Sequence, residues 1–203
     1  MANISDGIED GAFYQDRSFT ALDLGGRTLS GVEFEGCTFA RCTFNEAVFA
    51  RCRLVECRFE GCDLSVARFP ETRLSEIAFN GCKLSGVDWT LPAEAQALRL
   101  PLSVSFDDCV LDYGSCFGVV LSGVTMRRCQ AHELDLSEAD LTGADLGETD
   151  FAGAKFLHTK LIKADLRGAR RYAIDPTSNP VKGARFSLPE AVSLLRAFGV
   201  RLE

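Results

Sequence analysis

The sequence has few polar aromatic residues, few histidines and no long apolar run. Fifteen phenylalanines stand against one tryptophan, three tyrosines and two histidines. The longest uncharged run, residues 113–126, has 14 residues, short of the roughly 20 that a membrane-spanning helix needs. Residues 1–10 carry three acids and no base, so they lack the basic start of a signal peptide. We therefore expect a cytoplasmic protein that does not bind a membrane.

Motifs for catalysis or cofactor binding are also missing. The chain has no Cys-x-x-Cys, no Gly-x-Gly-x-x-Gly and no phosphate-binding loop, and neither His132 nor His158 has neighbours at a metal-ligand or nucleophile spacing. The nine cysteines fall at inward positions of a repeat described below, so we interpret them as reduced, buried core residues. The sequence predicts no enzyme activity, no metal and no cofactor.

The charge balance is acidic. The 203 residues include 29 acids and 22 bases, which gives a net charge of −7. Phosphate contacts need an excess of Lys and Arg, so this balance disfavours direct binding to nucleic acid. With 46% hydrophobic residues, the chain has ordinary globular composition and enough length for one domain or two small ones.

An apolar residue recurs at every fifth position. All 15 positions from Phe19 to Trp89 are apolar, and the pattern resumes from Phe106 to Leu166. A period of five fits neither an α-helix nor a continuous strand. Two inward residues separated by one outward residue make a short strand, and the other two residues must then turn the chain. Each pentapeptide is therefore one side of a coil, and the coils stack as a solenoid.

The motif itself resembles a known family. Residues 139–143, 144–148 and 164–168 read ADLTG, ADLGE and ADLRG, which is similar to the motif of pentapeptide-repeat proteins. The resemblance implies an all-β fold, a right-handed quadrilateral β-helix with 20 residues per coil. Phe19, Phe39, Phe59 and Phe79 recur at that spacing, so we expect them to form one interior column.

Breaks in the repeat divide the chain into segments. We predict an N-terminal cap at residues 1–16, a first repeat block at 17–89, an interruption or hinge loop at 90–103 and a second block at 104–171. The frame slips by two residues at the interruption. Residues 172–203 are predicted as an irregular connector and a C-terminal capping and dimerisation α-helix, with Ser187 and Glu190 in a capping box and Gly199 at its end.

The densest run of acids has no Lys or Arg between residues 131 and 154. It contains Glu133, Asp135, Glu138, Asp140, Asp145, Glu148 and Asp150. One interpretation is a solvated repeat surface, and the other is an acidic band that contacts a basic partner. The interruption, with Glu94 and Arg99, is a second candidate for partner binding. Bases are concentrated just after the acidic band, between Lys155 and Arg171.

The C-terminal segment resembles a subgroup of the family. Residues 193–200, SLLRAFGV, are similar to the closing signature of pentapeptide proteins that protect DNA gyrase from quinolones, albicidin or microcin. That resemblance implies a non-enzymatic DNA mimic in antibiotic resistance or self-immunity, with DNA gyrase or topoisomerase IV as partner. It also implies a homodimer, for which the expected contacts are Leu188, Val192, Leu195, Phe198 and Val200. The alternative is a structural or scaffold protein with an unrelated protein partner.

Overall fold

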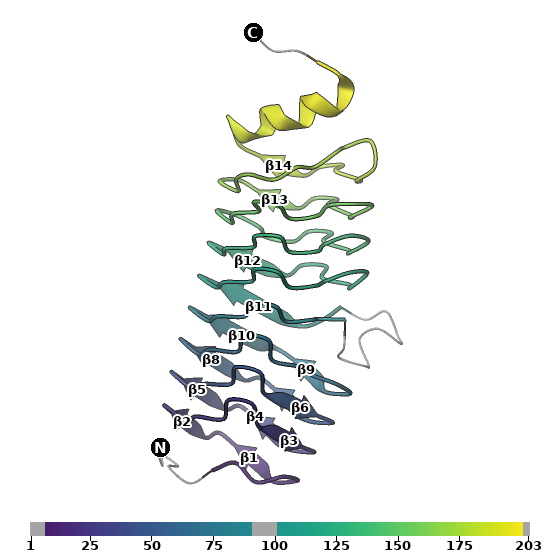
Figure 1. Ribbon diagram of the computed structural model, residues 1–203. Helices are drawn as coiled ribbons and strands as arrows, with labels where there is room; N and C mark the ends of the chain where they lie inside the picture. The colour runs from purple at the N-terminus through teal and green to yellow at the C-terminus, as the bar shows by residue number, and fades with distance from the viewer. Residues whose placement is uncertain (1–6, 91–100, 201–203) are drawn as a thin grey trace.

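Each five-residue repeat forms one side of a four-sided coil, and the coils stack into a rod (Figure 1). The computed structural model describes residues 7–90 and 101–200. Every fifth residue from Gly11 to Gly86, and again from Asp108 to Gly168, has a positive φ. This left-handed residue turns the chain at each corner, where a non-glycine residue costs about 1 kcal/mol or more. The turn returns the next inward pair to the same core.

All the strand pairs are parallel, and they join one coil to the next. We name the four sides A to D in chain order, beginning with the sides that contain Phe19, Leu24, Leu29 and Phe34. Side A holds β2 (Ser18–Thr20), β5 (Thr38–Ala40), β8 (Arg58–Glu60), β10 (Ile77–Asn80), β11 (Val104–Asp107) and β12 (Thr125–Arg127), followed by β13 (Asp165–Leu166) and β14 (Arg185–Phe186). Side D holds β1 (Phe13–Gln15), β4 (Glu33–Glu35), β7 (Arg53–Val55) and β9 (Arg73–Ser75), and side C holds β3 (Thr28–Ser30) and β6 (Val48–Ala50). Single bridges complete side B and the upper coils.

Stacked rings fill the core of the first block. Phe19, Phe39, Phe59 and Phe79 are in register on side A, and successive ring centroids are 5.0, 4.7 and 5.1 Å apart. All four are buried, which confirms the predicted column. Full burial of each ring contributes on the order of 1.5–3 kcal/mol before conformational entropy is subtracted. A thin solenoid needs these contacts because each coil touches only its neighbours.

All nine cysteines are free thiols inside the solenoid, as predicted. Cys42, Cys62, Cys82, Cys109 and Cys129 follow one another along the edge between sides A and B. The first four thiols bond to carbonyl groups one coil below, as Cys62 does to the Phe39 oxygen at 3.3 Å. The Cys129 thiol bonds to the Arg127 oxygen of its own coil at 3.1 Å. Burial raises the pKa of the Cys116 thiol. These residues act as small buried core groups with weak internal hydrogen bonds.

The interruption leaves the stacking register intact. Phe59 pairs with Phe79 at a spacing of 20 residues, and Phe79 pairs with Phe106 at a spacing of 27. One turn therefore contains seven extra residues (27 − 20), placed between Trp89 on side C and the return to side A. Residues 91–100, with the predicted contacts Glu94 and Arg99, lie outside the described part of the chain.

The stack begins earlier and ends later than the sequence predicts. β1 pairs with β4, so residues 13–15 belong to a coil. β14 pairs with β13 and places Phe186 opposite Leu166, so residues 172–186 form another turn where we expected an irregular connector. Side A then has nine inward positions: Phe19, Phe39, Phe59, Phe79, Phe106, Met126, Leu146, Leu166 and Phe186. Eight steps of about 4.8 Å give a rod about 38 Å long.

A single helix closes the C-terminal end of the rod (Figure 1). It spans Glu190–Phe198 and is a 3₁₀-helix rather than the expected α-helix. The capping box was a wrong prediction, because Pro189 is the N-cap and the Ser187 hydroxyl instead accepts a bond from the Gly168 amide at 2.7 Å. Gly199 ends the helix at a φ of 69°, as expected. Within residues 7–90 and 101–200, no helix is long and apolar enough to cross a membrane.

Candidate partner-binding surface

The predicted acidic band encircles the rod instead of following its length. Its aspartates are five residues apart, and one coil has four sides of five residues. Asp135 therefore lies on side C, Asp140 on side D, Asp145 on side A and Asp150 on side B. One flat partner surface cannot contact all four.

Three of these aspartates build the corners of the coil. The carboxylates of Asp135, Asp140 and Asp145 accept hydrogen bonds from the amides two residues later, at 2.9, 3.0 and 3.1 Å. An Asp side chain that bonds in this way closes a tight turn. The recurring aspartate of the repeat is thus explained by local structure.

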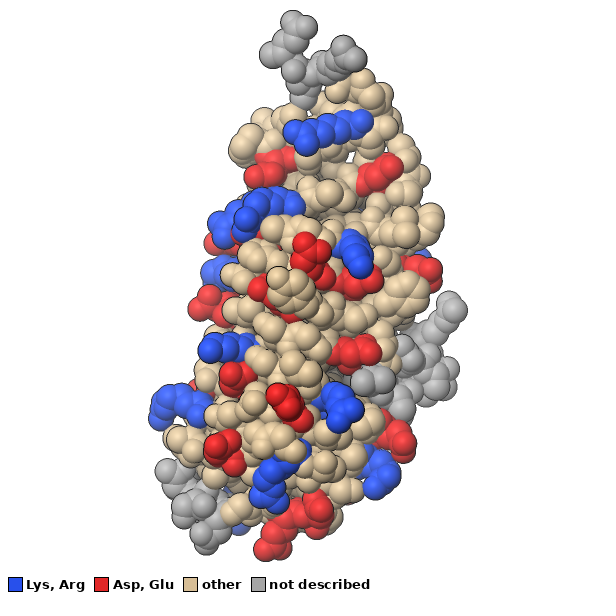
Figure 2. Space-filling model, viewed as in Figure 1, with Lys and Arg blue, Asp and Glu red and all other residues tan. Residues whose placement is uncertain are grey.

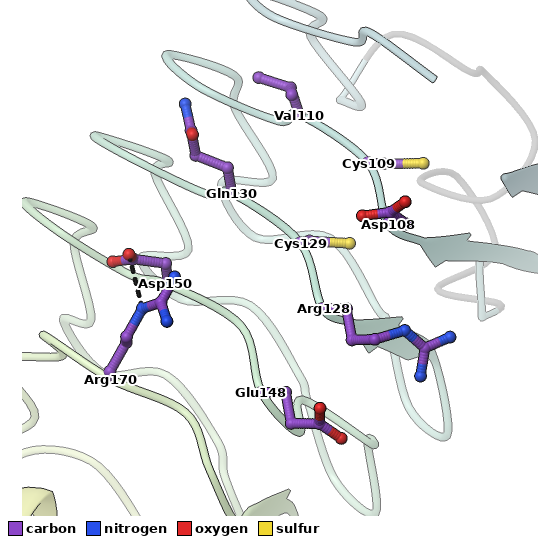
Figure 3. A pocket seen from close by; sticks show the side chains of 9 residues that line it. All are labelled: Asp108, Cys109, Val110, Arg128, Cys129, Gln130, Glu148, Asp150 and Arg170. Carbon is purple, nitrogen blue, oxygen red and sulfur yellow. Dashed lines mark hydrogen bonds and ion pairs between the residues drawn. The ribbon is translucent and has the colours of Figure 1, made fainter. Parts of the chain in front are cut away.

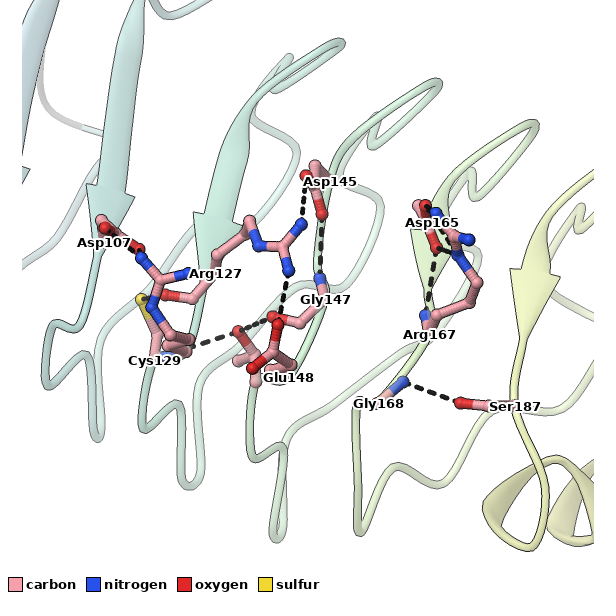
Figure 4. Close-up of polar contacts among 12 residues, drawn as sticks. Asp107, Arg127, Cys129, Asp145, Gly147, Glu148, Asp165, Arg167, Gly168 and Ser187 are labelled. Atoms are coloured by element: carbon pink, nitrogen blue, oxygen red, sulfur yellow. Dashed lines mark hydrogen bonds and ion pairs between the residues drawn. The ribbon is translucent and has the colours of Figure 1, made fainter.

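Basic residues from neighbouring coils neutralise the same aspartates. Lys155 lies 4.0 Å from Asp135, and Lys160 lies 3.2 Å from Asp140. Arg127 binds both Asp145, at 3.1 Å, and Glu148, at 2.5 Å (Figure 4). The bases that follow the acidic band in sequence are therefore stacked against it in space. Figure 2 shows the outcome on one face of the rod, where charges of both signs are interspersed.

Asp150 is the most strongly held of the predicted contacts. It is 3% exposed, and its carboxylate accepts bonds from Arg170 Nε at 2.8 Å and Arg171 Nε at 2.7 Å. Both bonds lower the pKa of the Asp150 carboxyl group below its ordinary range, and the bond from Arg171 has the larger effect. His132 Nε2 lies 3.6 Å away. Asp150 joins adjacent coils and offers little charge to a partner.

Glu133 and Glu138 differ from the other members of the band. Both are exposed and both occupy left-handed corners, at φ values of 54° and 60°. Within the described part of the chain they form no ion pair. Glu133 stands at the corner between sides B and C, and Glu138 at the corner between sides C and D. They border side C from its two edges.

Side C also carries exposed apolar residues that the sequence analysis missed. Tyr113 is 72% exposed, Phe117 47% and Leu157 54%. Tyr113 and Phe117 lie on the coil below the two glutamates, and Leu157 lies on the coil above them. The signal was present in the sequence, since all three occupy outward corner positions of the repeat. We call the surface formed by Tyr113, Phe117, Glu133, Glu138 and Leu157 the acidic–aromatic face.

A cleft of about 240 Å³ lies along the edge between sides A and B (Figure 3). Its two arginines are already paired, Arg128 with Asp107 and Arg170 with Asp150, and its Glu148 is paired with Arg127. Among residues 7–90 and 101–200, no three His, Cys, Asp or Glu side chains are placed to hold a metal ion. The lining residues are Asp108, Cys109, Val110, Arg128, Cys129, Gln130, Glu148, Asp150 and Arg170.

The residues predicted for dimerisation are solvent-exposed at the C-terminal end. Leu188 is 79% exposed and Phe198 61%, and Val192, Leu195 and Val200 are also exposed. Leu194 is the helix residue that packs against the core. The contact with a second copy remains a prediction.

Comparison with known proteins agrees with this architecture. The solved structure of HetL, a pentapeptide repeat protein involved in heterocyst differentiation regulation from the cyanobacterium Nostoc sp. strain PCC 7120, is 20% identical, with 87% of each chain covered and a TM-score of 0.50. Full-length QnrB1, a plasmid-mediated fluoroquinolone resistance protein, is 20% identical, with 98% of this chain and 95% of that chain covered and a TM-score of 0.48. At this identity the similarity to HetL establishes the fold alone. No curated protein matches the chain by sequence.

Two family descriptions match most of the solenoid. "Pentapeptide repeat region" matches residues 32–93, and "Pentapeptide repeats (8 copies)" matches residues 105–146 and 135–170. The matched segments coincide with the coils of the structure on both sides of the interruption. The chain therefore belongs to the pentapeptide-repeat family.

Proposed function

We propose that this protein is a non-enzymatic rod that binds a type II topoisomerase, DNA gyrase or topoisomerase IV, in place of a DNA segment. Binding displaces a poison such as a quinolone, albicidin or microcin. The observation that supports the proposal most is a set of exposed glutamates at left-handed corners, without ion pairs in the described part of the chain: Glu46, Glu56, Glu71, Glu76, Glu133 and Glu138.

These glutamates suit an electrostatic partner for physical reasons. Glycine would occupy each corner without steric cost, so a glutamate there is retained against local strain. The six lie on three corner columns, and within each column the rigid stack fixes the carboxylates at multiples of about 4.8 Å along the rod. A protein surface that holds DNA is rich in Lys and Arg, and such a surface attracts a preorganised array of carboxylates.

The helix at the end of the rod supports the second part of the proposal, a homodimer. Its exposed apolar residues lie where two copies joined end to end would cover them. Two-fold association buries the same patch on both copies, and it doubles the length of rod that one topoisomerase contacts. We propose Leu188, Val192, Leu195, Phe198 and Val200 as the contacts.

A scaffold role with another protein partner is the second candidate. The ion pairs of Asp135, Asp140 and Asp150 with the next coil reduce the charge expected of a DNA mimic. Exposed apolar side chains such as Tyr113 and Phe117 are also unnecessary for a surface that only replaces phosphates. The reduced charge favours recognition of a protein that does not bind DNA, whereas the apolar side chains indicate contact with a protein surface of either kind.

A supercoiling assay separates the two candidates. Purified DNA gyrase is incubated with relaxed DNA and a quinolone, albicidin or microcin, with and without the protein. We expect the protein to restore supercoiling against at least one poison, and its binding to gyrase to weaken with rising salt, because exposed charges are screened over about 8–10 Å near physiological ionic strength. No binding to gyrase or topoisomerase IV at low salt would overturn the proposal and favour the scaffold role.

A further inference from the structure

We propose that the acidic–aromatic face of side C is the anchor of the partner interface, and that it receives a protein segment carrying Lys or Arg beside an apolar side chain. This inference rests on the proposed function and assigns the contact to one surface. The band predicted from the sequence surrounds the rod, whereas the members of this face all lie along the two edges of side C.

The apolar members point to a protein partner. Tyr113 and Phe117 lie at the two ends of side C on one coil. They are four residues apart, which is about 13 Å along an extended chain. Leu157 lies two coils above Phe117, in the same corner column. Exposed tyrosine and phenylalanine are typical of interface centres, where they bury a large area with little loss of conformational freedom.

The charged members define what that protein segment carries. Glu133 and Glu138 stand between the two apolar levels and have no basic neighbour within ion-pair distance in the described part of the chain. Asp135, midway between the two glutamates on the same coil, forms an ion pair with Lys155 at 4.0 Å. A Lys or Arg of the partner would lie between the glutamates and within reach of the Tyr113 ring, where a cation is also attracted to the aromatic face.

The charge also argues against two other occupants. A nucleic acid would place phosphates against Glu133 and Glu138, which repel them. A second copy of this chain, paired through this face by a two-fold axis, would bring the same glutamates together. A basic and partly apolar protein segment satisfies both kinds of side chain at once.

The backbone under the face is already ordered. The amide of Tyr113 donates to the His132 oxygen at 2.8 Å, that of Glu133 to Ala152 at 2.9 Å, and that of Glu138 to Leu157 at 2.8 Å. These bonds tie each corner to the next coil. Binding therefore orders side chains only, which keeps its entropic cost low.

The test compares two double variants with two matched controls in binding to the purified DNA gyrase holoenzyme. Tyr113→Ser with Phe117→Ser removes the aromatic members, and Glu133→Gln with Glu138→Gln removes the charges. Val66→Ser and Glu60→Gln are the controls. Val66 occupies the same left-handed corner column as Tyr113 but lies in the first block, and Glu60 is an exposed first-block glutamate outside the corner set. Thermal unfolding verifies that each variant is folded.

We expect each double variant to weaken binding by about tenfold or more, and the controls to stay within about twofold. The glutamine variant should also lower the salt dependence of binding, while the serine variant should keep it. If the parent binds gyrase and both folded double variants bind as well as the controls, the anchor is wrong and the proposed function stands. If only the charge variant loses affinity, the aromatic part of the anchor is wrong. If the parent does not bind gyrase, the proposed function fails, and this assignment fails with it.

Discussion

Phe79 and Phe106 stack face to face across the break in the repeat, with ring centroids 5.5 Å apart and ring planes 9° apart. Phe39 and Phe59, inside the unbroken first block, stack at 4.7 Å and 13°. The interruption therefore adds residues to one turn without dividing the core. Because coils are stabilised through their neighbours, the two blocks are expected to support each other.

Truncation of one ring tests this column. Phe59→Ala should lower the free energy of unfolding by about 3–5 kcal/mol, because it removes a buried ring that stacks on both Phe39 and Phe79 and leaves a cavity. Denaturant titration measures the change. Phe59→Leu is the control, since the upper coils hold Met126, Leu146 and Leu166 at the corresponding side A positions, and it should cost less than the alanine variant. A loss below about 1 kcal/mol for Phe59→Ala would contradict the role of the column.

The fold follows from the sequence where the period of five is kept. The columns and the buried thiols depend only on which residues point inward, and that is a local property. The two ends could not be predicted in the same way. Pro176 and Pro180 interrupt the pattern although the chain completes another turn, and Ser187 bonds to Gly168 of the coil below instead of to the helix.

The candidate site was harder to predict because neighbours in sequence lie on different sides. A run of acids read along the chain indicates a band, but contacts on a coil connect residues about 20 apart. Asp135, Asp140 and Asp150 have Lys155, Lys160 and Arg170 at that spacing. Reading the charges at a spacing of 20 would have predicted those pairs. It would not have predicted the contacts of Arg127, which depend on the conformation of a long side chain.

A corner glutamate should be dispensable for stability. We expect Glu71→Gly to raise the free energy of unfolding by up to about 1 kcal/mol, because the φ of Glu71 is 52° and glycine adopts that conformation without strain. Glu60→Gly is the control, since Glu60 ends strand β8 without a positive φ, and there glycine should destabilise by about 0.5–1 kcal/mol. Chemical denaturation of the two variants measures both signs. Equal destabilisation would show that the corner φ costs nothing.

Asp150 links stability to pH. Its pKa is lowered in the folded protein by Arg171 and Arg170, and Arg167 lowers the pKa of Asp165 to about 2. A carboxyl group with a depressed folded pKa contributes stability that is present above its unfolded value, near 4, and is lost as the pH falls through the folded value. Unfolding free energies should therefore decrease steeply below about pH 4.

Asp150→Asn should flatten that decrease and cost about 1–3 kcal/mol at pH 7, since two arginines lose a charged acceptor. Glu133→Gln is the control for loss of one carboxylate and should leave stability at pH 7 within about 0.5 kcal/mol. An Asp150→Asn profile that matches the parent between pH 2 and 4 would show that the arginine pairs do not contribute.

The terminal helix gives the last prediction. Val192, Leu195 and Phe198 are three residues apart, and in a 3₁₀-helix this spacing aligns side chains in one straight row. All three are exposed, and an exposed apolar row of this kind marks an association surface. Leu195→Asp with Phe198→Asp should convert a dimer into monomers at micromolar concentration, as measured by sedimentation. Arg196→Gln, on the same helix but outside the row, should leave the dimer intact. A parent protein that sediments as a monomer, or a double variant that remains dimeric, would show that the row does not join two copies.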